Sequence, residues 1–334
     1  MNPLCKELTM KNRICDILGI EKPIIQGPMS WLTDARLVAA VSNAGGLGVL
    51  GPNAGLHQAE STPEGAAEKL REEIRKTKAL TDKPFGVNVI IDGELSVWTP
   101  PQVEVIKQEK VAVVVYTGYG EGGIIPELFA DLKAAGVKIV YRDINPTPEN
   151  TRRAEAAGAD VIVATGFDEG GTLPGQVMGT FSIVPLIADA TQNVPVMAAG
   201  GIADHRTAKA AFALGAEGLF VGSAFLTTTE SRMHDAAKEK VVAATGQDLL
   251  LFRTVPDYYR SLSTPLADKL AKMDKAGASK EEINALMGGL RGMKFGMLDG
   301  NFDEGYISVG NGIGSIHAVK SVAEVVEELT GWIA

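Results

Sequence analysis

The chain has few residues of the types that build metal sites and disulfide frameworks. Its 334 residues include 2 cysteines, 4 histidines and 6% aromatic residues. Cys5 and Cys15 are expected to be free thiols, because neither their spacing nor their neighbours suit a disulfide or a metal site. No His-x-His or Cys-x-x-Cys spacing occurs, so no metal is predicted. The histidines are His57, His205, His234 and His317.

Long hydrophobic runs and a basic charge balance are also missing. No apolar segment approaches the roughly 20 residues that span a bilayer. Residues 1–13 carry charges where a signal peptide has its apolar region. The net charge of −9 argues against nucleic-acid binding, which needs clustered Lys and Arg. We therefore expect a cytoplasmic protein that acts on a small molecule, with no nucleic-acid or membrane partner; a homodimer is compatible with the sequence.

What the chain has instead is 38 glycines and a regular alternation of short apolar runs with helical segments. This alternation is typical of a parallel α/β sheet. Eight such runs favour a closed (β/α)8 TIM barrel over an open doubly wound sheet. The expected strands are residues 23–26, 47–50, 85–90, 111–116, 138–141, 160–164, 194–199 and 218–221.

The alternation stops after Phe225, which divides the chain into three parts. Residues 1–226 are expected to form the barrel, and residues 227–300 an appended helical subdomain that inserts as a lid. Residues 301–334 are expected to form a glycine-rich loop and a helix that return to the barrel. Four methionines of the middle part are interpreted either as core residues or as a soft apolar face over a ligand. They are Met273, Met287, Met293 and Met297.

Two consecutive strands end in glycines that suit a phosphate. Gly200 and Gly201 follow the seventh strand, and Gly222 and Ser223 follow the eighth. Glycine lacks a β-carbon, so backbone N–H groups there can approach an anion closely. Phosphates commonly bind after strands seven and eight of a TIM barrel. The alternative is that these glycines only permit tight turns, but two such sites in successive units favour a phosphate.

The ends of the other strands offer mainly amides, hydroxyls and backbone groups. Such groups suit hydrogen bonding to a flat heteroaromatic ring better than metal-assisted hydrolysis. A ring together with a phosphate suggests FMN as the cofactor. Asp168 and Glu169, in the loop after the sixth strand, are interpreted as solvated charges.

Four motifs resemble the nitronate monooxygenase family, which includes enoyl-ACP reductase II. The resemblance covers residues 11–225, and the family fold is an FMN-binding (β/α)8 barrel with a helical insertion. The motifs are Pro23-Ile-Ile-Gln26-Gly27-Pro28-Met29, Asn43-Ala-Gly-Gly46-Leu-Gly48, Lys83-Pro-Phe-Gly-Val-Asn88 and Ala199-Gly-Gly-Ile-Ala-Asp204.

The resemblance implies which residues hold FMN. The phosphate is assigned to Gly200, Gly201, Gly222 and Ser223. Asn311 lies where the late loop of the family usually has Gln, and Thr165 is expected beside the cofactor. The isoalloxazine ring is assigned to Gln26, Gly27, Pro28, Met29 and Asn88.

Three positions depart from the family pattern, and each departure removes charge or basicity. Thr172 replaces the family's active-site His, Ala224 replaces Arg, and Thr165 replaces the Glu of enoyl-ACP reductase II. A Thr hydroxyl is not a general base near neutral pH. The site therefore favours hydride transfer to a neutral acceptor. Together with Thr172, the candidates for contact with the reacting atoms are Tyr119 and Tyr141 as proton donors, with His57 or water as alternatives.

Three functions follow from this reading. The leading one is reduction of an activated C=C bond, of the enone or enoyl type, with FMN as cofactor and NADH or NADPH as electron donor. The second is oxidation of alkyl nitronates with oxygen, using another base. The third is a flavin-binding protein without catalysis, such as a carrier or sensor.

Overall fold

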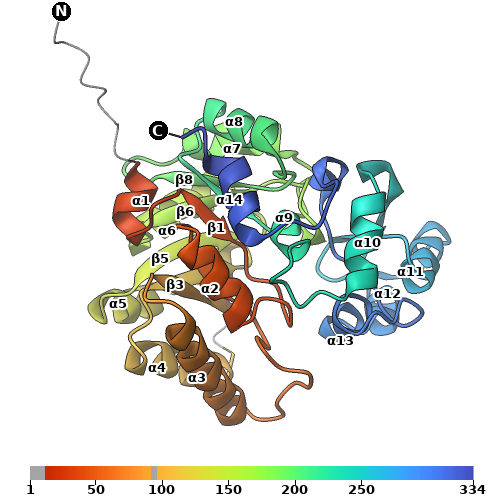
Figure 1. Ribbon diagram of the computed structural model, residues 1–334, viewed down its shortest axis with the longest axis horizontal. Helices are drawn as coiled ribbons and strands as arrows, with labels where there is room; N and C mark the ends of the chain where they lie inside the picture. Colours follow the sequence, from red (N-terminus) through yellow and green to blue (C-terminus); the bar gives the residue numbers. More distant parts are fainter. Residues whose placement is uncertain (1–11, 92–95, 334) are drawn as a thin grey trace, which may run out of the picture.

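The computed structural model describes residues 12–91 and 96–333, so Cys5 lies outside the described residues. Eight parallel strands form a nearly closed TIM barrel surrounded by helices, as the sequence predicted (Figure 1). The strands are β1 (Ile24–Gln26), β2 (Gly48–Leu50), β3 (Phe85–Ile91), β4 (Val113–Gly118), β5 (Lys138–Asp143), β6 (Val161–Thr165), β8 (Val196–Ala199) and β9 (Gly218–Val221).

The barrel closes between its first two strands. The sheet order is β1-β9-β8-β6-β5-β4-β3-β2, so β1 and β2 lie at its two ends. A parallel bridge between Ile25 and Leu47 joins these ends, with Gln26 N donating to Leu47 O at 3.0 Å. Apolar side chains fill the interior, among them Val113 and Val163. This packed core supports the open end of the barrel, where the strands finish at their carboxyl ends.

Helices cover the outside of the barrel, and hydroxyl or carboxylate caps set where several of them begin. Asp34, Thr62, Thr147 and Asp204 each accept a backbone N–H from the first turn of the helix that follows. No helix in the described part of the chain is long and apolar enough to cross a membrane. The helices up to β9 are α1 (Arg13–Leu18), α2 (Ala35–Asn43), α3 (Pro63–Leu80), α4 (Thr99–Gln108), α5 (Pro126–Ala134), α6 (Pro148–Ala157), α7 (Thr180–Ala188) and α8 (His205–Ala213).

The last helix completes the ring around the barrel. Helix α14 (Val322–Thr330) packs against both α8 and α2, in the place of the helix that should follow β9. The segment between β9 and α14 is therefore an insertion, and its helices α10–α13 lie to one side of the barrel (Figure 1). Its helices are α9 (Ser223–Leu226), α10 (Asp235–Ala243), α11 (Pro265–Lys275), α12 (Lys280–Met287) and α13 (Leu290–Met293), followed by a π-helical turn at Lys294–Leu298.

The insertion also contains a hairpin that the sequence analysis did not predict. Strands β10 (Leu249–Arg253) and β11 (Tyr258–Leu262) pair in antiparallel fashion. The second of them also pairs with β7 (Gly171–Leu173), which lies in the segment expected to be a loop after the sixth strand. This small sheet ties the insertion to the loop after β6, next to the open end of the barrel.

Candidate functional site

A cavity opens at the carboxyl ends of the barrel strands, the end where TIM barrels carry their active sites. Every barrel strand contributes to its lining, either with its last residues or with the loop that follows. The remaining wall comes from the insertion and from the glycine-rich loop before α14. The residues of that wall are Leu226, Leu290, Met293, Met297, Ser308, Gly310 and Gly312.

The glycines after β8 form one end of the cavity. Gly200 and Gly201 have φ angles of +102° and +72°, a region that favours glycine. A β-carbon on Gly200 would lie 2.8 Å from Thr180 Oγ1, and one on Gly201 would lie 3.1 Å from Asp168 Cβ. Larger residues therefore do not fit at either position.

Open backbone donors lie at this end of the cavity. Among the described residues, the amides of Gly201 and Gly222 donate no hydrogen bond, and both residues line the cavity. Ser223 also lines it, and its Oγ accepts a bond of 3.0 Å from Gly310 N. Free amides without bulky side chains are the donors that a phosphate needs, so the residues present here fit one.

Asn311 joins two loops next to these glycines through hydrogen bonds to Asp168. Its backbone N donates to the backbone oxygen of Asp168 at 2.9 Å, and its Nδ2 donates to Asp168 Oδ1 at 2.9 Å. Asp168 also accepts from Thr180 N at 2.7 Å. Burial acts to raise the pKa of Asp168, but these hydrogen bonds outweigh it and lower the pKa. Asn311 is not among the cavity-lining residues; it fastens the late loop to the loop after β6.

The residues after β1, where a ring was predicted to bind, line the cavity next to the residues that follow β9. Gly27, Pro28 and Met29 line it. Gln26 does not, because its fully buried side chain joins β1 to β2. Its Nε2 donates to Gly27 O and Val49 O, and its Oε1 accepts from Val49 N at 3.1 Å.

Asn88 and Thr165 present polar atoms near the cavity. Asn88 lines it, and its Nδ2 donates to Val115 O and Thr117 Oγ1, both at 2.9 Å. Thr165 is buried at the end of β6, and its Oγ1 has no hydrogen-bond partner. A buried polar atom without a partner is costly, but Thr165 is not among the residues that line the cavity.

Two charged residues that the sequence analysis left out of the site lie in this cavity. Arg142 at the end of β5 and Glu169 after β6 both line it, and each side chain is 14% exposed. Arg142 Nη2 donates to Glu169 Oε2 at 2.6 Å. Glu169 is thus a buried partner of an arginine, which corrects its interpretation as a solvated loop charge. Burial raises the pKa of Glu169 against the opposing effects of Arg142 and Arg260.

The two candidate tyrosines lie in different places. Tyr119 lines the cavity, whereas Tyr141 does not. The Tyr141 ring lies between the sheet and α5, with its centroid 5.9 Å from that of Tyr116 and 6.2 Å from that of Phe129. Burial, followed by the nearby carboxylate of Asp143, raises the pKa of Tyr141. Successive residues of a strand face opposite sides, and Arg142, the next residue, faces the cavity. Tyr141 therefore points away from the cavity, which corrects its prediction as a proton donor.

Thr172 and the histidines complete the comparison with the sequence predictions. Thr172 lines the cavity from β7, where it pairs with Tyr259 of β11. His57 does not line it, and its Nε2 lies 3.0 Å from Arg232 Nη2. Within residues 12–91 and 96–333, no group of three or more His, Cys, Asp or Glu side chains could hold a metal ion.

Two methionines of the insertion face the cavity and two pack in an apolar core, so both roles considered for them occur. Met293 and Met297 line the cavity, while Met273 and Met287 pack into the separate apolar cluster of the insertion. The cavity thus has a polar, glycine-rich end and an apolar wall. Such a site can hold a flat, phosphorylated ligand and still leave room for an apolar molecule beside it.

Comparisons with known proteins agree with this geometry. The sequence model of a family described as nitronate monooxygenase matches residues 11–99 and 93–331. The (3aS,4S,5R,7aS)-5-hydroxy-7a-methyl-1-oxo-octahydro-1H-indene-4-carboxyl-CoA dehydrogenase of Rhodococcus jostii is 36% identical over 265 residues, which are 78% of this chain and 68% of that protein. The nitronate monooxygenase of Paraburkholderia phytofirmans is 33% identical, over 70% of this chain and 71% of that protein.

A solved structure resembles nearly the whole chain. FabK from Thermotoga maritima superposes with a TM-score of 0.82 and 34% sequence identity. The match covers 96% of this chain and 95% of FabK, so it includes the insertion as well as the barrel.

Proposed function

Because the chain belongs to the nitronate monooxygenase family and is an oxidoreductase, we propose that it reduces a C=C bond conjugated to a carbonyl group. The acceptor is an enone or an enoyl thioester, the cofactor is FMN, and the electron donor is NADH or NADPH. FMN, when bound, supplies a ring that accepts a hydride and passes it on. The chain supplies the binding, the orientation and the proton.

The residues assigned to FMN support this proposal by their chemistry. Gly201 and Gly222 offer a phosphate open amides, Ser223 offers a hydroxyl, and a β-carbon at Gly200 would lie too close to Thr180 Oγ1. Gly27, Pro28, Met29 and Asn88 line the part of the cavity assigned to the ring. Gln26 and Asn311 hold these segments in place through hydrogen bonds, and the Thr165 hydroxyl has no partner within the protein.

The observation that carries the proposed reaction is the composition of the cavity wall. Leu226, Leu290, Met293 and Met297 are apolar side chains that line the cavity. An apolar wall favours an acceptor that is uncharged near its reacting carbons. Reduction of a conjugated C=C bond needs such a surface, a hydride source and one proton, and it needs no strong base in the cavity.

Two relatives support a thioester or a similar acyl compound as substrate. FabK is an enoyl-ACP reductase II, and the Rhodococcus relative is named as a dehydrogenase of a carboxyl-CoA compound. Both names refer to acyl compounds carried as thioesters, one on ACP and one on CoA. This shared chemistry favours an α,β-unsaturated acyl thioester over a simple enone.

An anaerobic titration tests the proposal. The purified protein, loaded with FMN, is titrated first with NADH and then with NADPH while the absorbance of the oxidised flavin is followed. We expect bleaching by at least one donor, and recovery of the absorbance when crotonyl-CoA or cyclohexenone is added without oxygen. No bleaching by either donor contradicts the proposal, and failure to bind FMN contradicts the cofactor assignment as well.

A second candidate function is the oxidation of alkyl nitronates with oxygen. The observation that favours it is the 33% identity with the nitronate monooxygenase of Paraburkholderia phytofirmans. This function predicts oxygen uptake with propyl-2-nitronate in the absence of NADH and NADPH. Oxygen uptake without bleaching by either nicotinamide would place this candidate first.

A further inference from the structure

The cavity contains few groups that can exchange a proton. Among the described residues that line it, three have titratable side chains: Tyr119, Arg142 and Glu169. Arginine stays protonated in proteins, so it cannot donate a proton to a substrate. A tyrosine hydroxyl can act as a general acid, but it is a weaker acid than a carboxyl group. The carboxyl group of Glu169 is therefore the stronger candidate, and Tyr119 is the alternative.

The position of Glu169 is set by contacts from two sides. Its Oε2 accepts from Arg142 Nη2 at 2.6 Å, and its backbone oxygen accepts from Arg260 Nη1 of β11. The same Arg260 nitrogen donates to Phe167 O, so the loop after β6 is held to the hairpin of the insertion. The carboxyl group is therefore presented to the cavity by a fixed backbone.

One oxygen of this carboxyl group has no partner. Glu169 Oε1 is buried and accepts no hydrogen bond, and Arg142 Nε is buried and donates none. Ion pairs that serve only stability satisfy their remaining polar atoms with further hydrogen bonds. Here one acceptor and one donor remain open beside a ligand cavity. A carboxyl oxygen in this state can carry a proton and give it to a bound molecule.

The surrounding charges allow the carboxyl group to change its protonation state. The cations that act on Glu169 are Arg142 of β5 and Arg260 of β11, and burial opposes them. Asp168, its neighbour in the chain, directs its carboxylate to Thr180 and Asn311. Burial favours the neutral acid, while Arg142 stabilises the carboxylate that remains after a proton is lost. Both states are thus accessible, as general acid catalysis requires.

We propose that Glu169 is the proton donor for the reduced substrate, a role that rests on the proposed C=C reduction. With FMN bound, the cofactor would supply the hydride that forms a C–H bond at the β-carbon of the acceptor. The electron pair of the C=C bond then forms a second C–H bond at the α-carbon with the proton of the Glu169 carboxyl. Glu169 is left as a carboxylate beside Arg142, and a proton from solvent restores the acid before the next turnover.

The test separates the two half-reactions of FMN-loaded Glu169→Gln by anaerobic stopped flow. The substitution keeps the size of the side chain and an oxygen for Arg142, but it removes the proton. We expect flavin reduction by NAD(P)H to stay close to the wild-type rate. Reoxidation by crotonyl-CoA should fall by about 10²–10⁴-fold, the usual contribution of a general acid. In the wild type this rate should fall as pH rises through the pKa of Glu169, and in the variant it should not.

Two further variants make the result specific. Glu127→Gln removes an exposed carboxylate of α5 and should react as the wild type does in both half-reactions. Tyr119→Phe removes the other titratable hydroxyl of the cavity. If Tyr119→Phe loses the reoxidation step and Glu169→Gln keeps it, the assignment to Glu169 is wrong.

The possible failures can be told apart. If neither NADH nor NADPH reduces the wild-type flavin, the proposed function fails whatever Glu169 does. If the wild type completes both half-reactions and Glu169→Gln reoxidises at the same rate, only the role of Glu169 fails. A readout without cofactor is the infrared difference spectrum between wild-type and Glu169→Gln apoprotein. We expect a pH-dependent band of a protonated carboxyl group, and its absence throughout acidic and neutral pH overturns the inference.

Discussion

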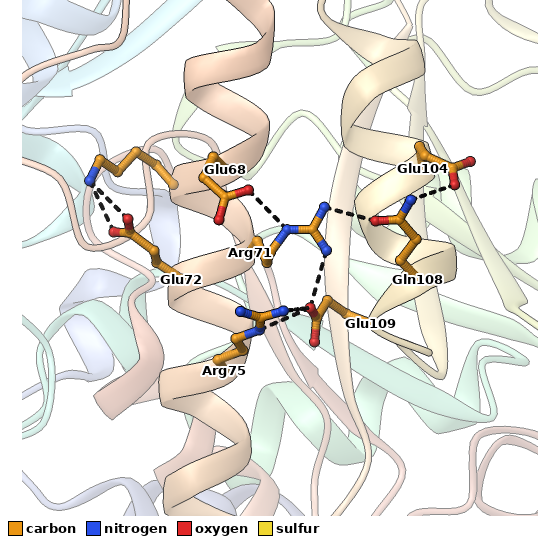
Figure 2. Close-up of polar contacts among 8 residues, drawn as sticks. Glu68, Arg71, Glu72, Arg75, Glu104, Gln108 and Glu109 are labelled. Atoms are coloured by element: carbon orange, nitrogen blue, oxygen red, sulfur yellow. Dashed lines mark hydrogen bonds and ion pairs between the residues drawn. The ribbon is translucent and has the colours of Figure 1, made fainter.

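Two of the carboxylates that lie beside arginines are placed differently: Glu109 lies between surface helices, and Glu169 lies in the cavity. Glu109, directly after α4, accepts from Arg71 at 3.2 Å and from Arg75 at 3.0 Å, both on α3 (Figure 2). Arg71 also donates hydrogen bonds to Glu68 and Gln108 (Figure 2). In this surface cluster Arg71 and Glu109 each have several partners.

The pair in the cavity is built differently. Glu169 has one side-chain donor, Arg142, and one oxygen without a partner. The two carboxylates accordingly have opposite pKa shifts. Burial acts to raise the pKa of Glu109, but the bonds from Arg75, Arg71 and Lys78 outweigh it and lower the pKa. At Glu169 burial prevails and the pKa is raised. The balance between donors and desolvation thus separates a structural carboxylate from one that is able to exchange a proton.

The largest loss of stability is expected from removing Arg142, the cation of the cavity pair. Arg142→Met leaves Glu169 buried without a charged donor, which costs about 3–5 kcal/mol in the free energy of unfolding while Glu169 is ionised. Urea unfolding at neutral pH measures this loss. The double variant Arg142→Met/Glu169→Gln should recover most of it, and an equal loss in the double variant would show that the arginine stabilises the fold by packing instead.

A smaller effect concerns how stability depends on pH. The raised pKa of Glu169 means that the unfolded chain ionises first, so the wild type loses stability relative to Glu169→Gln as pH rises from the unfolded pKa through the folded one. The difference is about 1.4 kcal/mol for each unit between the two pKa values. The lowered pKa of Glu109 gives the reverse: its contribution is present above the unfolded pKa and is lost as pH falls through the folded one.

Urea unfolding of the two glutamine variants over a pH series checks both signs. Glu109→Gln should be less stable than the wild type at neutral pH and should approach it in acid. The stability of Glu169→Gln relative to the wild type should increase from acid to neutral pH. If the stability difference from the wild type changed with pH in the same direction for both variants, the contrast between the two sites would be wrong.

The smallest effect is expected at the surface cluster itself. Arg75→Met makes the same kind of change as Arg142→Met, but the Arg75 side chain is 63% exposed and Glu109 keeps its other donors. We expect a loss of about 0.2–1 kcal/mol, and a smaller one at high salt. Thermal unfolding at low and high ionic strength measures it. A loss as large as that of Arg142→Met would mean that burial does not distinguish the two pairs.

The barrel could be predicted from the sequence because its signals are local. The strand at Gly218–Val221 has the predicted bounds, and β5 extends the predicted strand by two residues, to Asp143. Short apolar runs between glycines and capped helices specify these elements without any distant contact. The hairpin β10–β11 escaped prediction because its pairing with Gly171–Leu173 joins residues far apart in the chain.

The candidate site was predictable in part for the same reason. Glycines that follow strands mark the cavity, since a missing β-carbon is a local property. Tyr141 and Arg142 are adjacent at the end of one strand, and the barrel buries both of its faces, so hydrophobicity alone does not tell which side chain faces inward. In the fold Arg142 faces the cavity and Tyr141 packs against Phe129 of α5.

The sequence by itself determined the alternation of strands and helices, the class of the barrel and the glycine segments at its open end, because neighbouring residues encode each of them. Only the tertiary structure decided that Glu169, 27 residues from Arg142, is buried beside it with one oxygen free. The pKa of a carboxyl group depends on desolvation and on charges brought close by folding. A sequence shows that the carboxyl group is present, and the fold determines whether it is a solvated charge or an acid in a cavity.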